Sequence, residues 1–315
     1  MQPRSAALTV LVVIAILGGT LLVVRADDTQ KGSWTIQKSD TPGKVEFGLI
    51  YHRDGHHSDH TSDWPLTAFQ GLDLSLPGKQ DVRFAIVRDA GRFDCEGFVN
   101  NGEGAGIFHF IPEPRFSQQM SALGFPGIDA DKQFVMAAQD VSLDFAKQMK
   151  AENLEGLDTD RLVAFRIFDV NPRFIEDLRS AGLKITDSEK LVAFRIHGVT
   201  PGMVQYLRQA GYHPDEDTLV AMRIHGATPE FIEKLKQLGY EHIDLEQLIA
   251  FRIHGVSPEF VGKLQGLGYR HPDPEQLVAM RIHNVSPDFI AGLQARGMKN
   301  LTIDQLVEMK IHGID

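Results

Sequence analysis

Apolar residues return at the same positions of a repeating unit throughout the second half of the chain. The octapeptide LVAFRIHG at 191–198 recurs with few changes at 219–226, 248–255, 277–284 and 306–313. LVAFRIFD at 162–169 belongs to the same series, so the unit starts every 29 residues, with one interval of 28. Phe174, Phe145 and Phe116 continue this spacing toward the N-terminus. A fixed period of this length is typical of proteins built from stacked repeats.

Each unit begins with a segment that predicts a short helix, as SPEFVGKLQGLG illustrates. Ser257 suits the N-cap, because its hydroxyl can accept a hydrogen bond from a free backbone N–H, and Pro258 suits the first helical position. Phe260 and Leu264 lie on one helical stripe, which we expect to be buried. Gly268 can adopt the left-handed conformation that ends such a helix.

A second short helix follows in each unit and starts with an acidic residue. Asp273 suits the N-cap, Gln276 completes a capping-box pattern, and the helix extends to His283 and ends at Asn284. The equivalent N-cap positions hold Asp129, Asp158, Asp187, Asp215 and Asp244, with Thr302 in the last unit. Helices this short do not persist alone in water and must be stabilised by stacking on their neighbours. The pattern therefore predicts an α-solenoid of two-helix repeats.

One position of the second helix is occupied by small residues. It holds Ala164, Ala193, Ala221, Ala250 and Ala279. The last unit has Glu308 there, and a helix that no further repeat covers tolerates a charge. We therefore expect the alanines to lie where stacked helices approach closely.

The segment before the repeats has a different pattern, rich in β-branched and aromatic residues. Strands are predicted at 45–53, 81–88, 92–99 and 106–111. Asp89-Ala90-Gly91 predicts a tight hairpin; the glycine-rich NNGEGAG at 100–106 predicts a second one and lacks the Lys-Ser/Thr pair of a phosphate-binding loop. The expected fold is mostly α, with a small antiparallel β domain over 27–112 and helical repeats over 113–315.

The chain starts with an apolar run of 19 residues, 6–24, behind Met1 and Arg4. This length is long for the core of a signal peptide and short for a membrane span. Residues 1–26 are therefore expected to be either a cleaved signal peptide or a single N-terminal membrane anchor. In both cases the rest of the chain is expected to be exported, in the periplasm or cell envelope, and to contact the membrane only through 6–24.

Composition narrows the classes of function. The formal net charge is −10, and an acidic chain binds nucleic acid poorly, because contacts to phosphate need a basic face. The single cysteine, Cys95, excludes an internal disulfide and a cysteine-rich metal site, and its place in a predicted strand indicates a buried, unreactive thiol. Neither an H-E-x-x-H nor a G-x-S-x-G motif occurs, so no catalytic signature is present.

A histidine-rich stretch, YHRDGHHSDH, is the strongest candidate for a metal site. It contains His52, His56, His57 and His60, with Asp54 and Asp59 among them. Imidazole and carboxylate are suitable ligands for zinc and for other divalent transition metals, such as copper or nickel. The spacing implies no fixed ligand geometry, and polar stretches of this kind also form solvated surface loops. A third alternative is the active site of a hydrolase that uses these histidines with Asp63.

Two ladders of basic residues follow the repeat period. They consist of the histidines His197, His225, His254, His283 and His312 and of the cations Arg166, Arg195, Arg223, Arg252, Arg281 and Lys310. An anionic polymer, such as a cell-wall glycan or nucleic acid, is one ligand for such rows. Helix capping is the better interpretation, because each residue lies in the last turn of its helix, where a positive or hydrogen-bonding group contributes about 0.3–1 kcal/mol.

The repeat R-I-H-G-V-[TS]-P-E-F-[IV]-x-x-L-x-x-L-G-Y resembles repeats in the extracytoplasmic tail of bacterial membrane metallopeptidases of the beta-lactam-sensor, antirepressor-regulating type. The stretches R-D-A-G-x-F-x-x-E-G-F and G-x-G-A-G-x-F-x-F resemble the same tails, so the resemblance covers about 80–315. The peptidase part of that family is absent from this sequence. The resemblance implies an exported accessory or sensor-like repeat region, and it implies no catalytic residue.

These observations favour a non-catalytic binding or scaffold module that recognises a protein or peptide partner and is associated with a sensor. The solenoid supports this expectation, because stacked repeats offer elongated surfaces for recognition. The alternative is an exported metal-binding sensor or hydrolase that uses the histidines of 52–60.

Overall fold

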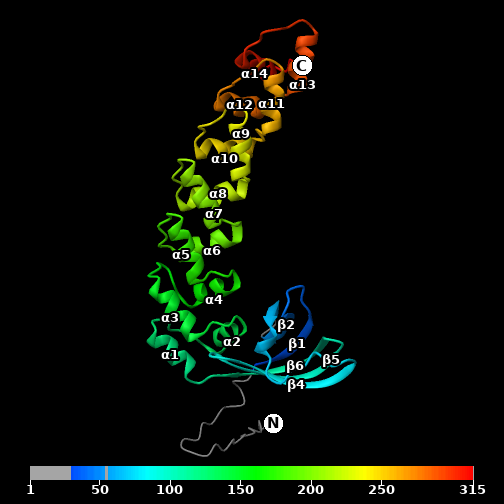
Figure 1. The fold of residues 1–315 in the computed structure, drawn as a ribbon, viewed down its shortest axis with the longest axis vertical. Helices are drawn as coiled ribbons and strands as arrows, with labels where there is room; N and C mark the ends of the chain where they lie inside the picture. Colours follow the sequence, from blue (N-terminus) through cyan, green and yellow to red (C-terminus); the bar gives the residue numbers. More distant parts are fainter. Residues whose placement is uncertain (1–29, 54–55, 315) are drawn as a thin grey trace, which may run out of the picture. The chain divides into compact units, whose positions relative to one another are not determined.

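Within the residues that the structure describes, 30–53 and 56–314, six β-strands precede fourteen α-helices. Figure 1 shows this computed structural model. The strands are β1 (Gln30–Lys38), β2 (Lys44–Arg53), β3 (His56–Pro65), β4 (Lys79–Arg88), β5 (Gly91–Asn100) and β6 (Glu103–Pro112). The helices are α1 (Phe116–Ala122), α2 (Ala130–Ala138), α3 (Leu143–Ala151), α4 (Thr159–Ile167), α5 (Pro172–Ser180), α6 (Ser188–His197), α7 (Pro201–Gln209), α8 (Glu216–His225), α9 (Pro229–Lys236), α10 (Leu245–His254), α11 (Pro258–Gly266), α12 (Pro274–Ile282), α13 (Pro287–Ala295) and α14 (Ile303–Ile311). The expected combination of a small antiparallel β domain and repeated two-helix units is confirmed.

The strands form one antiparallel sheet in the order β3-β2-β1-β6-β5-β4. Two of them, β1 and β3, are missing from the sequence prediction. The sequence of β1 has two fully buried apolar residues, Trp34 and Ile36, and that of β3, HHSDHTSDWP, is almost entirely polar. Both strands pair with β2, whose apolar pattern is clear. Their place in the sheet therefore depends on a neighbour and not on their own composition.

The two predicted hairpins are present, with tighter turns than expected. In the second one, Asn101 and Gly102 have φ values of 53° and 88° and form the turn, and β6 begins directly afterwards. Asn and Gly favour these positive φ values, which match the twist of the adjoining strands. Most of the glycine-rich stretch 100–106 is therefore strand and not loop.

Trp34 lies at the centre of the buried face of the sheet. Its register partner on β6 is Gly106, which lies opposite Gly97 on β5. A Cβ atom added at Gly97 or Gly106 would lie 2.8 or 2.7 Å from the indole ring, so glycine lets the ring pack flat on the strands. The indole Nε1 donates a hydrogen bond to the carbonyl of Glu96 at 3.2 Å. The glycines of β5 and β6 are therefore part of the core packing.

Helix α2 covers another part of the same face. The ring of Phe134 packs with centroid distances of 4.5–5.9 Å against the rings of Tyr51, Phe93, Phe108 and Phe110. The side chain of Gln133 is buried, and its Nε2 donates to the carbonyls of Ala90 at 2.7 Å and Glu113 at 2.8 Å. These contacts join α2 to both ends of the β5–β6 hairpin.

The chain divides into two compact units. Of the described residues, 30–53, 56–153 and 157–167 form the first, which holds the sheet and α1–α4. Residues 154–156 and 168–314 form the second, which holds α5–α14. The chain changes from strand to helix after Pro112, but this point is not the boundary between the compact units. The first four helices belong to the same unit as the sheet.

The helix ends match the signals in the sequence. Ser257 accepts a hydrogen bond from the backbone N–H three residues later at 3.2 Å, and the Oε1 of Gln276 accepts from the N–H of Asp273 at 3.1 Å. Gly268 and Asn284 follow their helices with φ values of 100° and 57°. Because these signals act within a few residues, the sequence alone is enough to place the helices.

All helices of the described part are short, and the longest have ten residues. Among residues 30–53 and 56–314, no helix is long and apolar enough to cross a bilayer. The apolar segment 6–24 lies outside the described residues, so cleavage or anchoring there stays a prediction.

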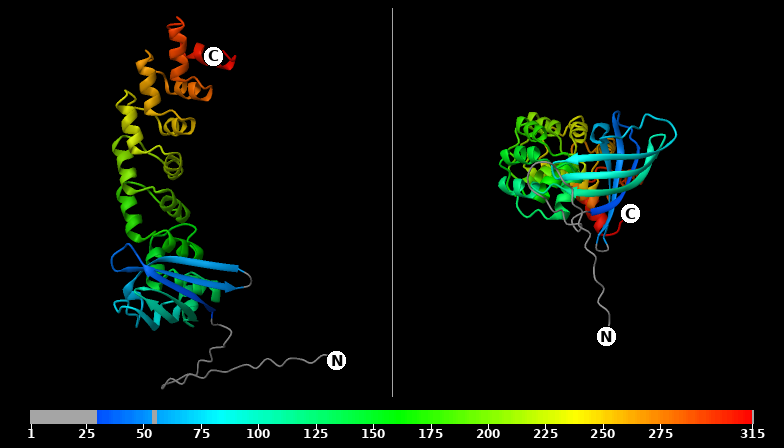
Figure 2. Two further views of the ribbon diagram at one scale, coloured as in Figure 1. Left: turned by 90° about the vertical axis from the view of Figure 1, so that its right-hand side faces the viewer. Right: turned by 90° about the horizontal axis from the view of Figure 1, so that it is seen from below.

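In the second unit, the helices of successive repeats form two rows, seen as two columns from green to red in Figure 2. Row A consists of α5, α7, α9, α11 and α13, and row B of α6, α8, α10, α12 and α14; each helix contacts the next one of its own row. Phe260 and Leu264 of row A are buried as predicted, whereas Lys263 is exposed. The buried stripe of each helix thus faces its neighbours, as a solenoid requires.

The alanines of row B are less enclosed than expected. Ala193, Ala221, Ala250 and Ala279 are half-buried. In α10, for example, Leu248 and Phe251 on either side of Ala250 are fully buried. The core of row B is therefore built from the leucine and from the phenylalanine or methionine, and the alanine lies at the border of the exposed side.

Candidate functional site

The arginines of row B connect each repeat to the one before it. In three of them, the Nε donates to the carbonyl of the last residue of the preceding row B helix: Arg223 to His197 at 3.0 Å, Arg252 to His225 at 3.2 Å and Arg281 to His254 at 3.4 Å. The Nε of Arg195, in the first helix of row B, donates to the carbonyl of Asp169 at 3.0 Å. The guanidinium of Arg252 also lies 5.0 Å from the ring centroid of Phe231 in row A. The arginines thus bond to helix-end carbonyls, but these belong to the preceding repeat and not, as predicted, to the arginine's own helix. These cations are therefore engaged within the protein and do not form a free basic row.

The glycine that ends a row B helix leaves room for the guanidinium of the next repeat. Gly198, Gly226 and Gly255 have φ values of 72°, 76° and 75°, and a Cβ added to each would lie 2.9, 3.1 or 3.0 Å from the Nη2 of the following arginine. Asn284 occupies the equivalent position where the following cation is Lys310. Lys310 lies over the ring of Phe289 at 4.1 Å. Arg195 bonds to the carbonyl of Asp169, which holds the same position with a φ of 53°, so glycine is the commonest residue in front of a connecting arginine but not a required one.

Tyrosines make a second connection between repeats. Their hydroxyls donate to carbonyls of the following repeat: Tyr212 to Ile243 at 2.9 Å, Tyr240 to Pro272 at 2.7 Å and Tyr269 to Leu301 at 2.8 Å. Burial raises the pKa of Tyr240 to about 12. This hydroxyl therefore keeps its proton at neutral pH and remains a donor.

Row B exposes one isoleucine in each repeat. Ile196, Ile224, Ile253, Ile282 and Ile311, here called the isoleucine ladder, are each between 52% and 59% exposed. In the first repeat of row B, Phe194 and Val199 are buried, and the N–H of Val199 donates to the carbonyl of Phe194 at 2.8 Å, which closes the helix end without Ile196. A β-branched residue is also a weaker helix former than Lys, Glu or Ala. Stability therefore does not explain isoleucine at this position.

The same side of each row B helix carries an acidic residue. It lies seven positions before the isoleucine and is exposed in every case: Glu189, Asp217, Glu246, Glu275 and Asp304, here called the acidic ladder. The helix dipole favours an acid in the first turn. Asp217 pairs with Lys190, whereas among the described residues Glu246 and Glu275 have no ion-pair partner. Row B thus presents an apolar line and a parallel acidic line.

The predicted histidine cluster lies in the β2–β3 hairpin. The register pairs His52 with His57 and Leu49 with His60. His52 therefore lies in β2, and His56, His57 and His60 lie in β3. The alternative that the stretch forms a surface loop is wrong for these residues. Among the side chains that the structure describes, no group of three or more His, Cys, Asp or Glu could hold a metal ion. The side chains of 52–60 are not among them, so metal binding there stays a prediction.

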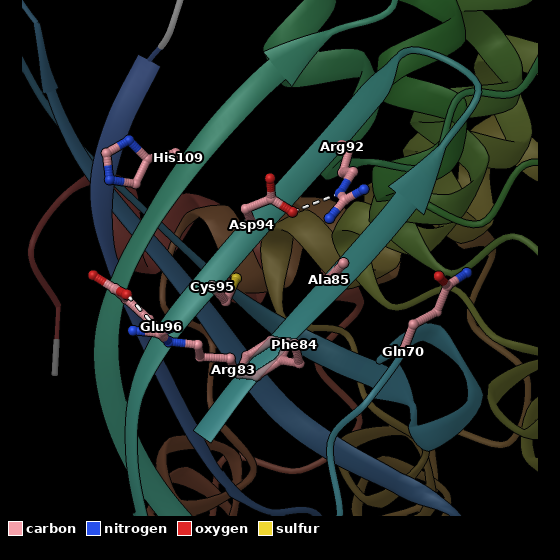
Figure 3. A pocket seen from close by; sticks show the side chains of 9 residues that line it. All are labelled: Gln70, Arg83, Phe84, Ala85, Arg92, Asp94, Cys95, Glu96 and His109. Atoms are coloured by element: carbon pink, nitrogen blue, oxygen red, sulfur yellow. Dashed lines mark hydrogen bonds and ion pairs between the residues drawn. The ribbon is translucent and has the colours of Figure 1, made fainter. Parts of the chain in front are cut away.

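The face of the sheet opposite Trp34 has a hollow over β4, β5 and β6, shown in Figure 3. Its charged side chains are paired with each other: the Nε of Arg92 lies 2.5 Å from the Oδ1 of Asp94, and the Nε of Arg83 lies 3.7 Å from the Oε2 of Glu96. Burial, and secondarily the charge of Asp94, raises the pKa of the Cys95 thiol, so its reactive thiolate is not formed at neutral pH. The hollow therefore does not combine a nucleophile with a base.

Asp63, the carboxylate of the hydrolase alternative, stabilises a turn. The hydroxyl of Thr41 donates to its Oδ2 at 2.9 Å. Hydrogen bonds from the hydroxyls of Ser39 and Thr41 lower the pKa of Asp63. A carboxyl group that acts as a general acid near neutral pH needs a raised pKa, so this environment does not suit that role.

Comparison with known proteins adds no family to this description. No family model matches the chain, and no curated protein matches it. The class of protein is therefore defined by the fold, a helical-repeat protein with an N-terminal antiparallel sheet. The resemblance to metallopeptidase tails stays a prediction.

Proposed function

We propose that the chain is a non-catalytic binding module that recognises a protein or peptide partner through the exposed side of row B. The observation that supports this function is the isoleucine ladder, whose five members are each more than half exposed. Single apolar residues on a surface need no explanation, but an apolar residue at the same place of successive stacked helices forms a continuous line. Solenoid proteins use such elongated surfaces for recognition.

The chemistry of the described residues favours binding over catalysis. The carboxylates in the hollow of the sheet, Asp94 and Glu96, are paired with guanidinium groups, and the thiol of Cys95 is buried. The arginines of row B are bonded to carbonyls. The exposed side of row B thus carries an apolar line and an acidic line, a combination that suits contact with a polypeptide.

A peptide-display library selected on the full chain tests this function. Selected ligands are expected to lose affinity by on the order of tenfold for the triple variant Ile224→Ser, Ile253→Ser, Ile282→Ser. A matched variant on row A, Gln205→Ser, Lys234→Ser, Lys263→Ser, changes three exposed residues and should bind as the wild type does. Ligands that bind both variants equally well would show that row B is not the binding surface.

We further place the module outside the cytoplasm, in association with a sensor. This location is supported by the apolar run 6–24, and the sensor association by the resemblance of the repeats. A cysteine introduced at Asp315, with Cys95 replaced by Ala, should react with a membrane-impermeant maleimide on cells with an intact inner membrane. Labelling that requires lysis of the inner membrane would contradict the location.

A further inference from the structure

We propose that row B binds an extended polypeptide in the polyproline II conformation, with an apolar side chain at every third position and cationic side chains directed toward the acidic ladder. This inference rests on the proposed function and specifies the ligand. The isoleucine ladder and the acidic ladder are its two lines of contact, and together they span α6 to α14.

The backbone of row B offers a ligand no hydrogen-bonding edge. In the first turns of α8 and α10, the side chains of Asp215 and Asp244 each accept a hydrogen bond from one backbone N–H, three residues further on. The last carbonyls of the same helices, those of His225 and His254, accept hydrogen bonds from arginines. A β-strand ligand gains its affinity from the open edge of a sheet, whereas a polyproline II chain keeps its backbone solvated and binds through side chains. The surface of row B therefore suits the second kind of ligand.

The usual spacing of packed helices fits the same conformation. Helices packed side by side lie about 8–10 Å apart, and each isoleucine occupies the same position of its helix. A polyproline II chain rises about 3.1 Å per residue with three residues per turn, so one side of it recurs every ~9.3 Å. One side of a β-strand recurs every ~6.7 Å, and two turns of an α-helix rise ~10.8 Å. Among these periods that of polyproline II lies within the range of helix spacings, and about 13 residues of it would cover the four steps from Ile196 to Ile311.

Charge specifies the second line of the ligand. In α10, Glu246 lies seven residues before Ile253, which corresponds to ~10.5 Å along the helix. Ile249 and Ala250, which lie between them, are half-buried. The row's own arginines are bonded to carbonyls, so the acidic ladder faces the ligand without an intervening cation in this helix. A ligand residue next to each apolar one is therefore Lys or Arg, and proline suits the third position because it favours the conformation.

Synthetic peptides that differ in period test the inference. The triplet peptide is (Leu-Lys-Pro)4-Leu, and its partner has the same residues shuffled so that leucine does not recur every third position. Fluorescence anisotropy with the full chain should show that the triplet peptide binds tighter by on the order of tenfold. The difference should disappear in the variant Ile224→Ser, Ile253→Ser, Ile282→Ser. Equal affinities, or tighter binding of a Leu/Lys peptide with helical period, would overturn the inference.

This result is distinguishable from a failure of the proposed function. One outcome is that library ligands depend on the isoleucine ladder but the triplet and shuffled peptides bind equally well. This outcome would support the proposed function and contradict the polyproline II ligand. Library ligands that ignore the ladder would remove both.

A matched pair of charge variants tests the acidic line. Glu246→Gln with Glu275→Gln should weaken binding of the triplet peptide severalfold and reduce its dependence on salt. Glu230→Gln with Glu259→Gln makes the same charge change in the first turns of row A and should leave the affinity unchanged. Equal effects of the two pairs would show that only the net charge matters and would overturn the placement of the ligand's cations.

Discussion

Rows A and B stack in the same way but differ in what they expose. In row A, the apolar residues Phe260 and Leu264 are buried and the exposed Lys263 is polar, so burial accounts for the pattern. In row B, Phe251 is fully buried, yet Ile253 on the same helix is 53% exposed. Row A therefore contains the apolar residues that packing requires, and row B contains one more in each repeat. The difference separates residues that stabilise the stack from a residue that needs another explanation.

The largest effect on stability is expected in the core of row A. Phe260 is 6% exposed, and Phe260→Ala should lower the free energy of unfolding by about 3–5 kcal/mol through lost burial and a cavity. Lys263→Ala, on the exposed side of the same helix, should change it by less than about 0.5 kcal/mol. Chemical denaturation of both variants checks this contrast. A similar cost for the two would mean that this helix faces its neighbours differently.

A smaller loss is expected where the two rows are connected. Arg252→Ala removes the hydrogen bond to the carbonyl of His225 and the contact with the ring of Phe231, and should cost about 1–2 kcal/mol. Arg252→Lys keeps the charge over the ring, as Lys310 does over Phe289, and should cost less. Thermal melts rank the two variants. If Arg252→Ala melts as the wild type does, the arginine contributes nothing to the stacking.

At the border of the exposed side of row B, a new charge should be tolerated in part. The recurring alanine in the sequence suggests that Ala250→Glu causes a large loss of stability. Ala250 is half-buried, however, and a glutamate there can extend toward water. We expect a loss of about 1 kcal/mol, and no measurable loss for Glu308→Ala in the last helix. Denaturation curves measure both. A loss for Ala250→Glu as large as that for Phe260→Ala would place the alanine between helices after all.

The smallest effect on stability is expected for the isoleucine ladder itself. Ile253→Ser should cost less than about 1 kcal/mol, because half of the side chain is already in water and the two residues have similar helix propensities. Denaturation of this variant beside Phe260→Ala completes the comparison of the rows. A cost comparable to that of Phe260→Ala would show that Ile253 is a core residue.

The sequence predicts the helices well because their signals are local. Ser257 and Asp273 cap helices a few residues away, and their hydrogen bonds are found where the pattern placed them. Strand β1 escapes prediction because Trp34 depends on Gly97 and Gly106, which lie more than 60 residues away. The partner of Arg252 escapes it for the same reason, since the carbonyl belongs to the preceding repeat.

The exposed isoleucines are the least predictable part of the candidate site. Ile253 belongs to the apolar run LIAFRI, in which Leu248 and Phe251 are buried. Periodicity within so short a run does not show which side the neighbouring helices cover. The packing of the row B helices on each other determines which side is covered, and Ile253 lies on the side that stays exposed.

The most direct test of the difference between the rows measures stability and binding in the same variant. The triple variant Ile224→Ser, Ile253→Ser, Ile282→Ser is expected to fold and to melt with a Tm close to that of the wild type. Its affinity for row B ligands is expected to fall by on the order of tenfold. A large fall in Tm would show that the ladder stabilises the stack. An unchanged affinity at an unchanged Tm would show that the isoleucine ladder is not a binding surface.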